Sequence, residues 1–166
     1  MRYADGPSVE VEVRIAAPPA QVWPLVCDVD LPGRFSDEFQ GAVWLDGASA
    51  PSVGARFKGR NHHPAIGDWE TISIITECEP DKLLAWAVSD INRPASSWRF
   101  ELDGDDDGTR LRQAARLGPG HSGTSFEIKM NPEDEEQIIE RRLGEHRINM
   151  RRTIEGLKEL AESGGK

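Results

Sequence analysis

The strongest constraint on the fold is a series of strand-like segments that ends in one long helix-like segment. Between residues 41 and 118, Gly, Pro, Asp and Asn separate six stretches of strand character: GAVWLDG, GARFKGRNHH, DWETISIITECEP, KLLAWAVSD, SSWRFELDG and GTRLRQAARLG. Residues 8–16 alternate strictly between apolar and polar side chains, which predicts one more half-buried strand ahead of them. An antiparallel meander is the simplest arrangement for these segments.

Beyond the last strand the apolar period changes to three and four residues. Asn131 is expected to cap a long helix with residues 132–135 in its first turn. Its apolar stripe is Ile139, Leu143, Met150, Ile154, Leu157 and Ala161. His146 and Arg147 interrupt this stripe, so one or both are expected at its buried edge, whereas Arg142 is expected to point elsewhere.

Two short helices are expected between the first two strands, in APPAQVWPLVCDVD and LPGRFSDEF. Pro24 removes a backbone donor inside the first of them and should shorten or kink it. The long helix must cover the apolar face of the sheet, so the predicted class is α+β, in a single domain over residues 1–166.

Charge and composition exclude several classes of partner. The 29 acidic residues outnumber the 20 basic ones, for a net charge of −9, which argues against nucleic acid or an anionic membrane as the main partner. No apolar run is long enough to span a bilayer, so stable membrane insertion is not expected. Cys27 and Cys78 lack any CxxC spacing and predict reduced thiols in a cytoplasmic protein. The protein is expected to be a monomer or a homodimer.

The order of these segments resembles the START-like, Bet v 1-type (SRPBCC) superfamily, in particular its bacterial polyketide cyclase/dehydrase-like branch. The resemblance covers roughly residues 8–162 and is carried by VEVRIAAPPAQVWPLVCDVDLPGRFSD, GARFKGRN, DWETISIITECEP and RRLGEHRINMRRTIEGLKELAE. It implies a helix-grip fold, in which a bent seven-stranded antiparallel sheet surrounds the C-terminal helix and leaves an elongated internal cavity. Similar proteins bind lipids, polyketides, hormones or other apolar small molecules, and some catalyse cyclisation or dehydration.

The strand at residues 56–63 independently favours a cavity. One phase carries the cations Arg56, Lys58 and Arg60, and the inward phase combines a large ring, a glycine and polar tips, which a dry core rarely contains. Aromatic walls with few polar groups are typical of a small-molecule site, although aromatic residues at alternating strand positions also suit an ordinary core. The predicted lining consists of Phe57, Asn61, His63, Trp69, Trp86, Trp98, Phe100, Gln113, His146, Arg147 and Met150.

The chemical motifs are few. His62 and His63 are adjacent in a strand and point to opposite faces, so they cannot chelate one ion together, and no metal is expected. A site built from His63, His146 and a carboxylate stays conceivable. The sequence contains no GxSxG turn and no phosphate-binding glycine loop, so no cofactor is expected and covalent catalysis is disfavoured. Acid–base chemistry remains open, with His63 and His146 as the catalytic candidates.

Three functions follow from these features. The first is a carrier or sensor that binds a hydrophobic small molecule, such as a lipid or polyketide, in the internal cavity. The alternative is a polyketide cyclase, aromatase or dehydratase that uses acid–base chemistry in the same cavity. The third is a stress-type or toxin–antitoxin-associated module that acts through protein contacts. The Gly-rich residues 118–124, with the loops after Phe35 and Asp90, are expected to form a mobile entrance.

Overall fold

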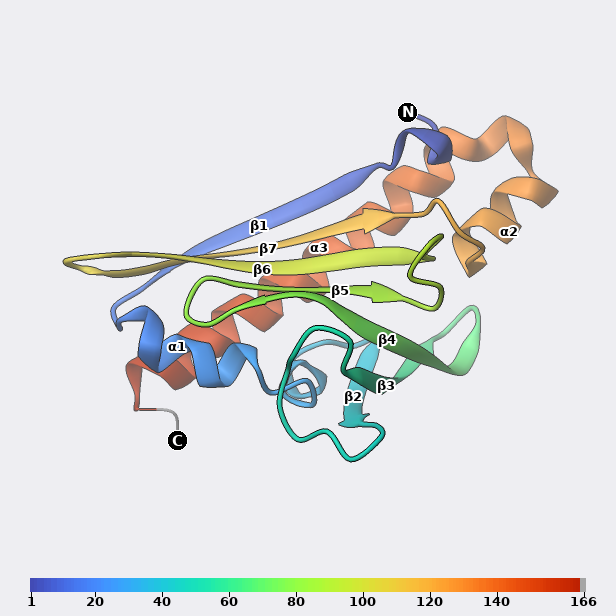
Figure 1. The fold of residues 1–166 in the computed structure, drawn as a ribbon. Coiled ribbons are helices and arrows are strands. Elements are labelled where there is room, and N and C mark those ends of the chain that lie inside the picture. The colour runs from blue at the N-terminus through green and yellow to red at the C-terminus, as the bar shows by residue number, and fades with distance from the viewer. Residues whose placement is uncertain (165–166) are drawn as a thin grey trace.

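The computed structural model describes residues 1–164 and confirms the predicted meander (Figure 1). One antiparallel sheet of seven strands has the order β1-β7-β6-β5-β4-β3-β2. The strands are β1 (Ser8–Ile15), β2 (Phe39–Trp44), β3 (Arg56–His63), β4 (Gly67–Glu79), β5 (Leu83–Val88), β6 (Ser96–Asp105) and β7 (Gly108–Leu117). Strands β2 to β7 follow one another across the sheet, and β1 pairs with β7 at the far edge.

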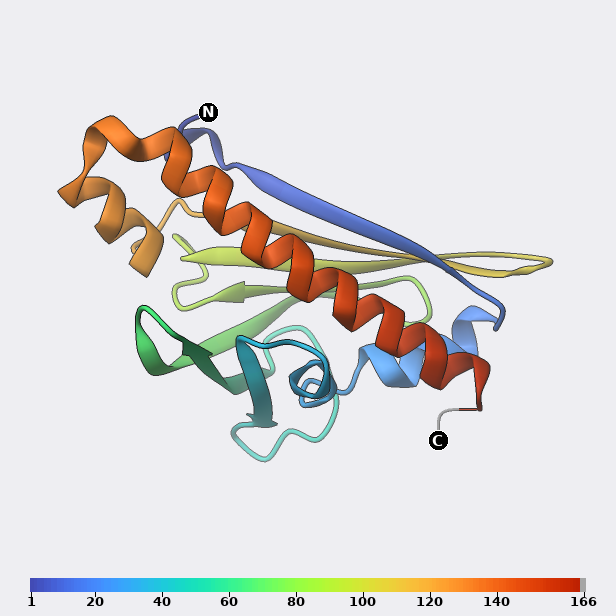
Figure 2. The same cartoon turned by 180° about the vertical axis from the view of Figure 1, so that it is seen from behind.

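Three helices accompany this sheet within residues 1–164. They are α1 (Pro19–Val26), α2 (Gly123–Met130) and α3 (Glu135–Glu162), with 3-10 turns at Tyr3–Asp5, Leu31–Arg34 and Pro132–Asp134. Figure 2 shows α3 running obliquely across the sheet, and its backbone comes nearest to β1 and β7. The helix-grip prediction is therefore confirmed, as are the two short helical segments between β1 and β2. None of the described helices has the length and apolar character that crossing a membrane requires.

Two boundaries differ from the sequence prediction. A second helix, α2, follows residues that were expected to form a loop, because Ser122 caps it: the backbone N–H of Ser125 donates to the Ser122 hydroxyl at 3.1 Å. The long helix begins at Glu135, three residues later than expected. Asn131 does not cap it, since the Asn131 side-chain amide donates to the Glu127 carbonyl at 3.1 Å and ends α2 instead.

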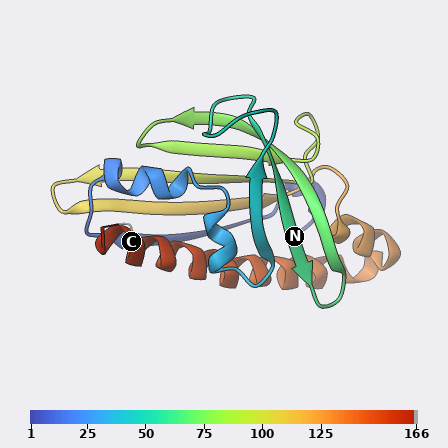
Figure 3. The ribbon, with the colours of Figure 1, turned by 90° about the horizontal axis from the view of Figure 1, so that it is seen from below.

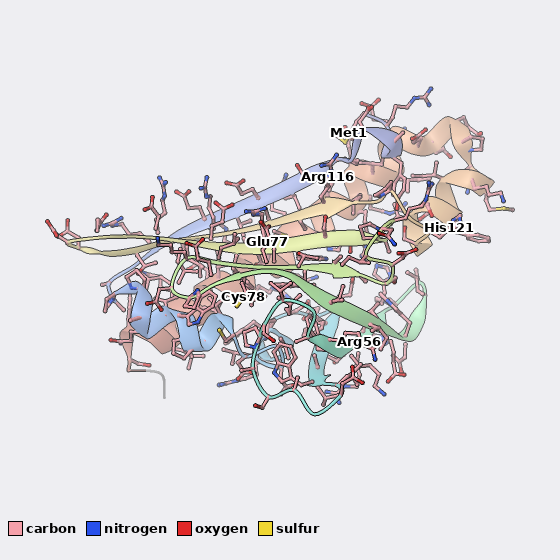
Figure 4. The ribbon with its side chains drawn as sticks, viewed as in Figure 1. Met1, Arg56, Glu77, Cys78, Arg116 and His121 are labelled. Carbon is pink, nitrogen blue, oxygen red and sulfur yellow. The ribbon has the colours of Figure 1, made fainter. Side chains whose placement is uncertain are left out.

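The sheet curls around α3 and gives the molecule a convex and a concave side (Figure 3). Register shifts between Phe39 and Gly41 and between Ile75 and Glu77 interrupt the ladders of β2 and β4, and such bulges bend a strand. The convex side carries the charges, as Figure 4 shows for Glu77 and Arg116. Arg56 of β3 pairs with Asp46 on this side, which confirms that the β3 cations form a solvated face.

Two glycines of α3 give opposite predictions for stability. A Cβ atom on Gly156 would overlap the ring of Phe35, whereas a Cβ atom on Gly144 would meet nothing within 4 Å. We expect Gly156→Ala to lower the free energy of unfolding by about 1 to 2 kcal/mol through overpacking. The matched Gly144→Ala should raise it by about 0.5 to 1 kcal/mol through helix propensity alone. Urea unfolding of both variants measures this, and equal effects would contradict the close packing of Phe35 on α3.

Candidate functional site

A row of aromatic rings crosses the concave side of the sheet. The ring centroids of Trp44 and Phe57 are 5.6 Å apart, those of Phe57 and Trp86 are 5.9 Å apart, and those of Trp86 and Phe100 are 5.9 Å apart. These residues come from β2, β3, β5 and β6, and their inward phase brings them onto one surface. The row gives the concave side a continuous apolar wall.

This wall is not sealed by the protein. Phe57 and Phe100 are buried, but Trp86 and Trp98 remain partly exposed although they lie on the middle strands and face inward. Trp69 is also partly exposed, and its pairing with Asn61 places it on the same concave side. The concave side therefore keeps accessible aromatic surface.

The glycine in the inward phase of β3, Gly59, is explained by the packing of the protein itself. Gly59 lies on the concave side and is buried, and a Cβ atom there would come within 2.9 Å of a ring carbon of Phe39. Phe39 lies on β2, where it pairs with Asn61, two residues after Gly59. The ring of Phe39 thus fills the space that a side chain at position 59 would take, and it leaves no room for a ligand there.

Two polar side chains on the concave side lack partners. Gln113 of β7 is 5% exposed and His146 of α3 is 7% exposed. The Gln113 side-chain oxygen is buried without a hydrogen bond, and within residues 1–164 no side-chain hydrogen bond involves Gln113 or His146. The His146 imidazole instead packs edge-on against Trp98, with ring centroids 5.1 Å apart. Burial, with a smaller effect from the charge of Arg142, lowers the pKa of His146 to about 3, so this imidazole is neutral at pH 7.

Near the hairpin of β3 and β4, four charged or polar side chains form what we call the ionic cluster: Glu38, His63, Arg142 and Glu145. His63 Nε2 lies 2.8 Å from a carboxylate oxygen of Glu145. Arg142 donates to the other Glu145 oxygen at 3.1 Å and to both oxygens of Glu38 at 2.5 and 2.6 Å. The cluster joins the end of β3 and the segment before β2 to α3.

The electrostatics of the cluster favour its charged form. Burial opposes the charge of Arg142, but the hydrogen bonds and charges of Glu38 and Glu145 outweigh it and raise the pKa of Arg142. Burial would raise the pKa of Glu145, yet the bonds to His63 and Arg142 outweigh it and lower that pKa. Arg142 had been expected to point away from the buried side, and that expectation is wrong, because its side chain is only 17% exposed.

The cluster also contains the only group of metal-ligating side chains found among the described residues. Ligand atoms of Glu38, His63 and Glu145 all lie within 4.8 Å of one another. Arg142 already occupies both carboxylates, and its cation would oppose a metal ion between them. His146 is not part of this group, so the conceivable site of His63, His146 and a carboxylate is not assembled.

The remaining sequence candidates are placed as follows. Asn61 lies on the concave side, 3.4 Å from the Thr71 hydroxyl and 3.5 Å from the Trp69 carbonyl, which are long hydrogen bonds. Met150 is buried on α3. Arg147 is exposed, which does not fit a place in an enclosed lining. Glu38, Arg142 and Glu145 were missed because nothing local in the sequence brings residue 38 to residue 142.

Hydrogen bonds hold the residues that were expected to form a mobile entrance. In the expected entrance at residues 118–124, the N–H groups of Gly118 and Gly120 donate to Ala95 and Pro94 at 2.9 and 2.7 Å, and the Tyr3 hydroxyl donates to the Gly120 carbonyl at 2.8 Å. These bonds do not support a freely moving loop.

Cys27 is a free thiol, and burial raises its pKa to about 12, so it is a poor nucleophile.

Comparisons with known proteins found chains with the same fold. A polyketide cyclase-like protein from Corynebacterium glutamicum is 29% identical, with a TM-score of 0.64 over 93% of this chain and 91% of that one. The di-domain ARO/CYC BexL from the BE-7585A biosynthetic pathway is 17% identical, with a TM-score of 0.69 over 93% of this chain and 50% of BexL.

Ara h 8.0201 shares the fold, with a TM-score of 0.53 at 13% identity over 90% of this chain and 98% of that one. A search of the curated proteins found no significant match. The family model described as polyketide cyclase / dehydrase and lipid transport matches residues 6–162, which is most of the chain. The chain therefore belongs to this polyketide cyclase/dehydrase-like branch of the SRPBCC, Bet v 1-type proteins.

Proposed function

We propose that this protein binds a hydrophobic small molecule, such as a lipid or polyketide, on the concave side of its sheet and acts as its carrier or sensor. The observation that carries the proposal is the partial exposure of Trp86 and Trp98, which face inward on the middle strands. Apolar surface that faces α3 without being sealed is what a small hydrophobic ligand would cover. The family description, which includes lipid transport, supports the same class of ligand.

The polar groups would orient the ligand within this apolar surface. Within residues 1–164, the side chains of Gln113 and His146 make no hydrogen bond, and a ligand atom beside the aromatic row would supply one. Phe57 and Phe100 are the buried members of the aromatic row, and the buried Met150 lies on α3. The free thiols Cys27 and Cys78 fit a reducing compartment such as the cytoplasm.

A neutral dye tests the binding site directly. We expect Nile red to bind with a rise and blue shift of its emission, and with energy transfer from tryptophan to the dye. Trp86→Phe and Trp98→Phe should each reduce this transfer, whereas the control Trp23→Phe on α1 should change it less. Fatty alcohols, sterols and aromatic polyphenols should compete with the dye. If Nile red does not bind and no member of this panel changes the intrinsic fluorescence, the proposal is wrong.

A cyclase or dehydratase is the second candidate, because His146 offers an unpaired neutral imidazole beside the accessible Trp98 ring. His63, held by Glu145, is the candidate to remove a proton next to a ligand carbonyl, and the neutral imidazole of His146 would donate a hydrogen bond to the carbonyl oxygen. With a poly-β-ketone analogue, His63→Gln and His146→Gln should abolish cyclised product while Nile red still binds. Unchanged product formation in both variants would remove these residues from the mechanism.

A further inference from the structure

Gln113 carries an inference about the ligand that rests on the proposed binding function. It is the only side chain on the concave side, among residues 1–164, that has a fully buried polar atom with no hydrogen-bond partner. Leaving such an atom unpaired costs about 1 to 3 kcal/mol, so an otherwise well-packed protein does not keep it without a compensating contact. The Gln113 amide therefore marks a position at which the ligand, or a water that the ligand displaces, supplies a hydrogen bond.

The surroundings of Gln113 place this position beside His146. Gln113 pairs with Phe100 on β6, and Trp98, two residues before Phe100, pairs with Ala115. Trp98 and Gln113 are thus diagonal neighbours on the concave side, about 7 to 8 Å apart and within reach of long side chains. His146 packs against Trp98 from α3, so both unpaired polar groups border the same accessible aromatic surface.

The charge of this region excludes one kind of ligand. Both Gln113 and His146 are uncharged, since burial keeps the imidazole neutral. Arg142, one helical turn before His146, already donates to Glu38 and Glu145 and offers no free charge. A carboxylate only accepts hydrogen bonds and would leave the Gln113 oxygen unpaired. Moving it from water to this site, without a cation, would also carry the cost of an uncompensated buried charge.

We propose that the ligand is uncharged and presents a hydroxyl group to Gln113 and His146, and that the protein selects such molecules against carboxylic acids of the same shape. A hydroxyl both donates and accepts, so it can donate to the amide oxygen and accept from the amide nitrogen or the imidazole. This property makes the match independent of which way the amide is turned. The proposed ligand class, hydrophobic small molecules, is thereby narrowed to uncharged molecules that carry a hydroxyl group.

Matched probes test the selection. The ring series is 2-naphthol, 2-methoxynaphthalene and 2-naphthoate, and the chain series is dodecanol, dodecyl methyl ether and dodecanoate. Displacement of Nile red at pH 7.5 gives their relative affinities. In the series that fits the site better, we expect the alcohol to bind about tenfold more tightly than the ether and more tightly than the carboxylate, because only the alcohol donates to Gln113.

The variant Gln113→Met separates this inference from the function on which it rests. Methionine has a similar length and no hydrogen-bonding groups, so the preference for alcohol over ether should fall to less than about twofold while the ether still binds. The melting temperature should rise, because the unpaired amide is removed. The control Gln137→Met, at an exposed position of α3, should keep the wild-type preference. Equal affinities for alcohol and ether in the wild type, or tighter binding of the carboxylate, would overturn the inference alone, whereas failure of every probe to bind would overturn the proposed function as well.

Discussion

Replacing Arg142 with methionine is expected to lower the free energy of unfolding by about 3 kcal/mol at pH 7. The Arg142 and Glu38 side chains are only 17% and 14% exposed, and the guanidinium donates to both Glu38 oxygens. Methionine can fill the volume of the aliphatic stem but leaves Glu38 and Glu145 as partly buried carboxylates without that cation. Urea unfolding monitored by circular dichroism at pH 7 measures the loss.

The neighbouring residue on the same helix provides a matched control. Arg141 pairs with Glu127, but these two side chains are 55% and 43% exposed. Exposed ion pairs contribute at most about 1 kcal/mol, so Arg141→Met should have a much smaller effect. Adding Glu38→Gln to Arg142→Met should recover part of the stability, since it removes the charge that Arg142 compensated. Equal losses in the free energy of unfolding for Arg141→Met and Arg142→Met would show that burial of the ionic cluster adds nothing to stability.

The ionic cluster matters for the concave side because it fixes one end of it. The two Glu38 bonds hold the segment before β2 against α3, and the His63–Glu145 contact holds the end of β3 against the same helix. The aromatic row begins on these two strands with Trp44 and Phe57. Loss of the cluster is therefore expected to loosen the wall as well as to destabilise the fold.

The sequence was sufficient for the fold because each element carries its own local signal. Residues 8–16 alternate because every second side chain of a strand faces the core. The apolar period changes before α3 because every third or fourth side chain of a helix faces the core. The inward phase of Phe57, Trp86, Trp98 and Phe100 was also predictable, because strand residues alternate between the two faces. Helix α2 was missed because its apolar residues, Phe126, Ile128 and Met130, are spaced by two rather than by three or four residues, and only the Ser122 cap marks its start.

The site was less predictable because its contacts join distant parts of the chain. Glu38 and Arg142 are 104 residues apart, and no periodicity relates them. The role of Gly59 could not be read from the strand either, since the ring that fills its place comes from Phe39 on a different strand. His146 was identified because it interrupts an apolar stripe, which is a local signal, but its lack of a partner appears only in the folded protein.

His146 gives the second large effect, through the pH dependence of stability. A histidine in the unfolded chain takes up a proton near pH 6.5, whereas burial, followed by the charge of Arg142, lowers the pKa of His146 in the folded protein to about 3. Between these values the unfolded state binds more protons, so stability is complete above pH 6.5 and is lost as the pH falls. The loss due to His146 is expected to reach about 2 kcal/mol at pH 5.

Variants at His146 isolate this contribution from those of the other titrating groups. The decrease in the free energy of unfolding between pH 7.5 and pH 5 should be about 2 kcal/mol smaller in His146→Gln than in the wild type, and His146→Met should behave alike. The exposed His121, near α2 in Figure 4, provides the control, because His121→Gln should keep the wild-type decrease. Parallel pH profiles for the wild type and both His146 variants would mean that this imidazole is hydrated or paired in solution, and the neutral environment on which the selection of uncharged ligands rests would then be absent.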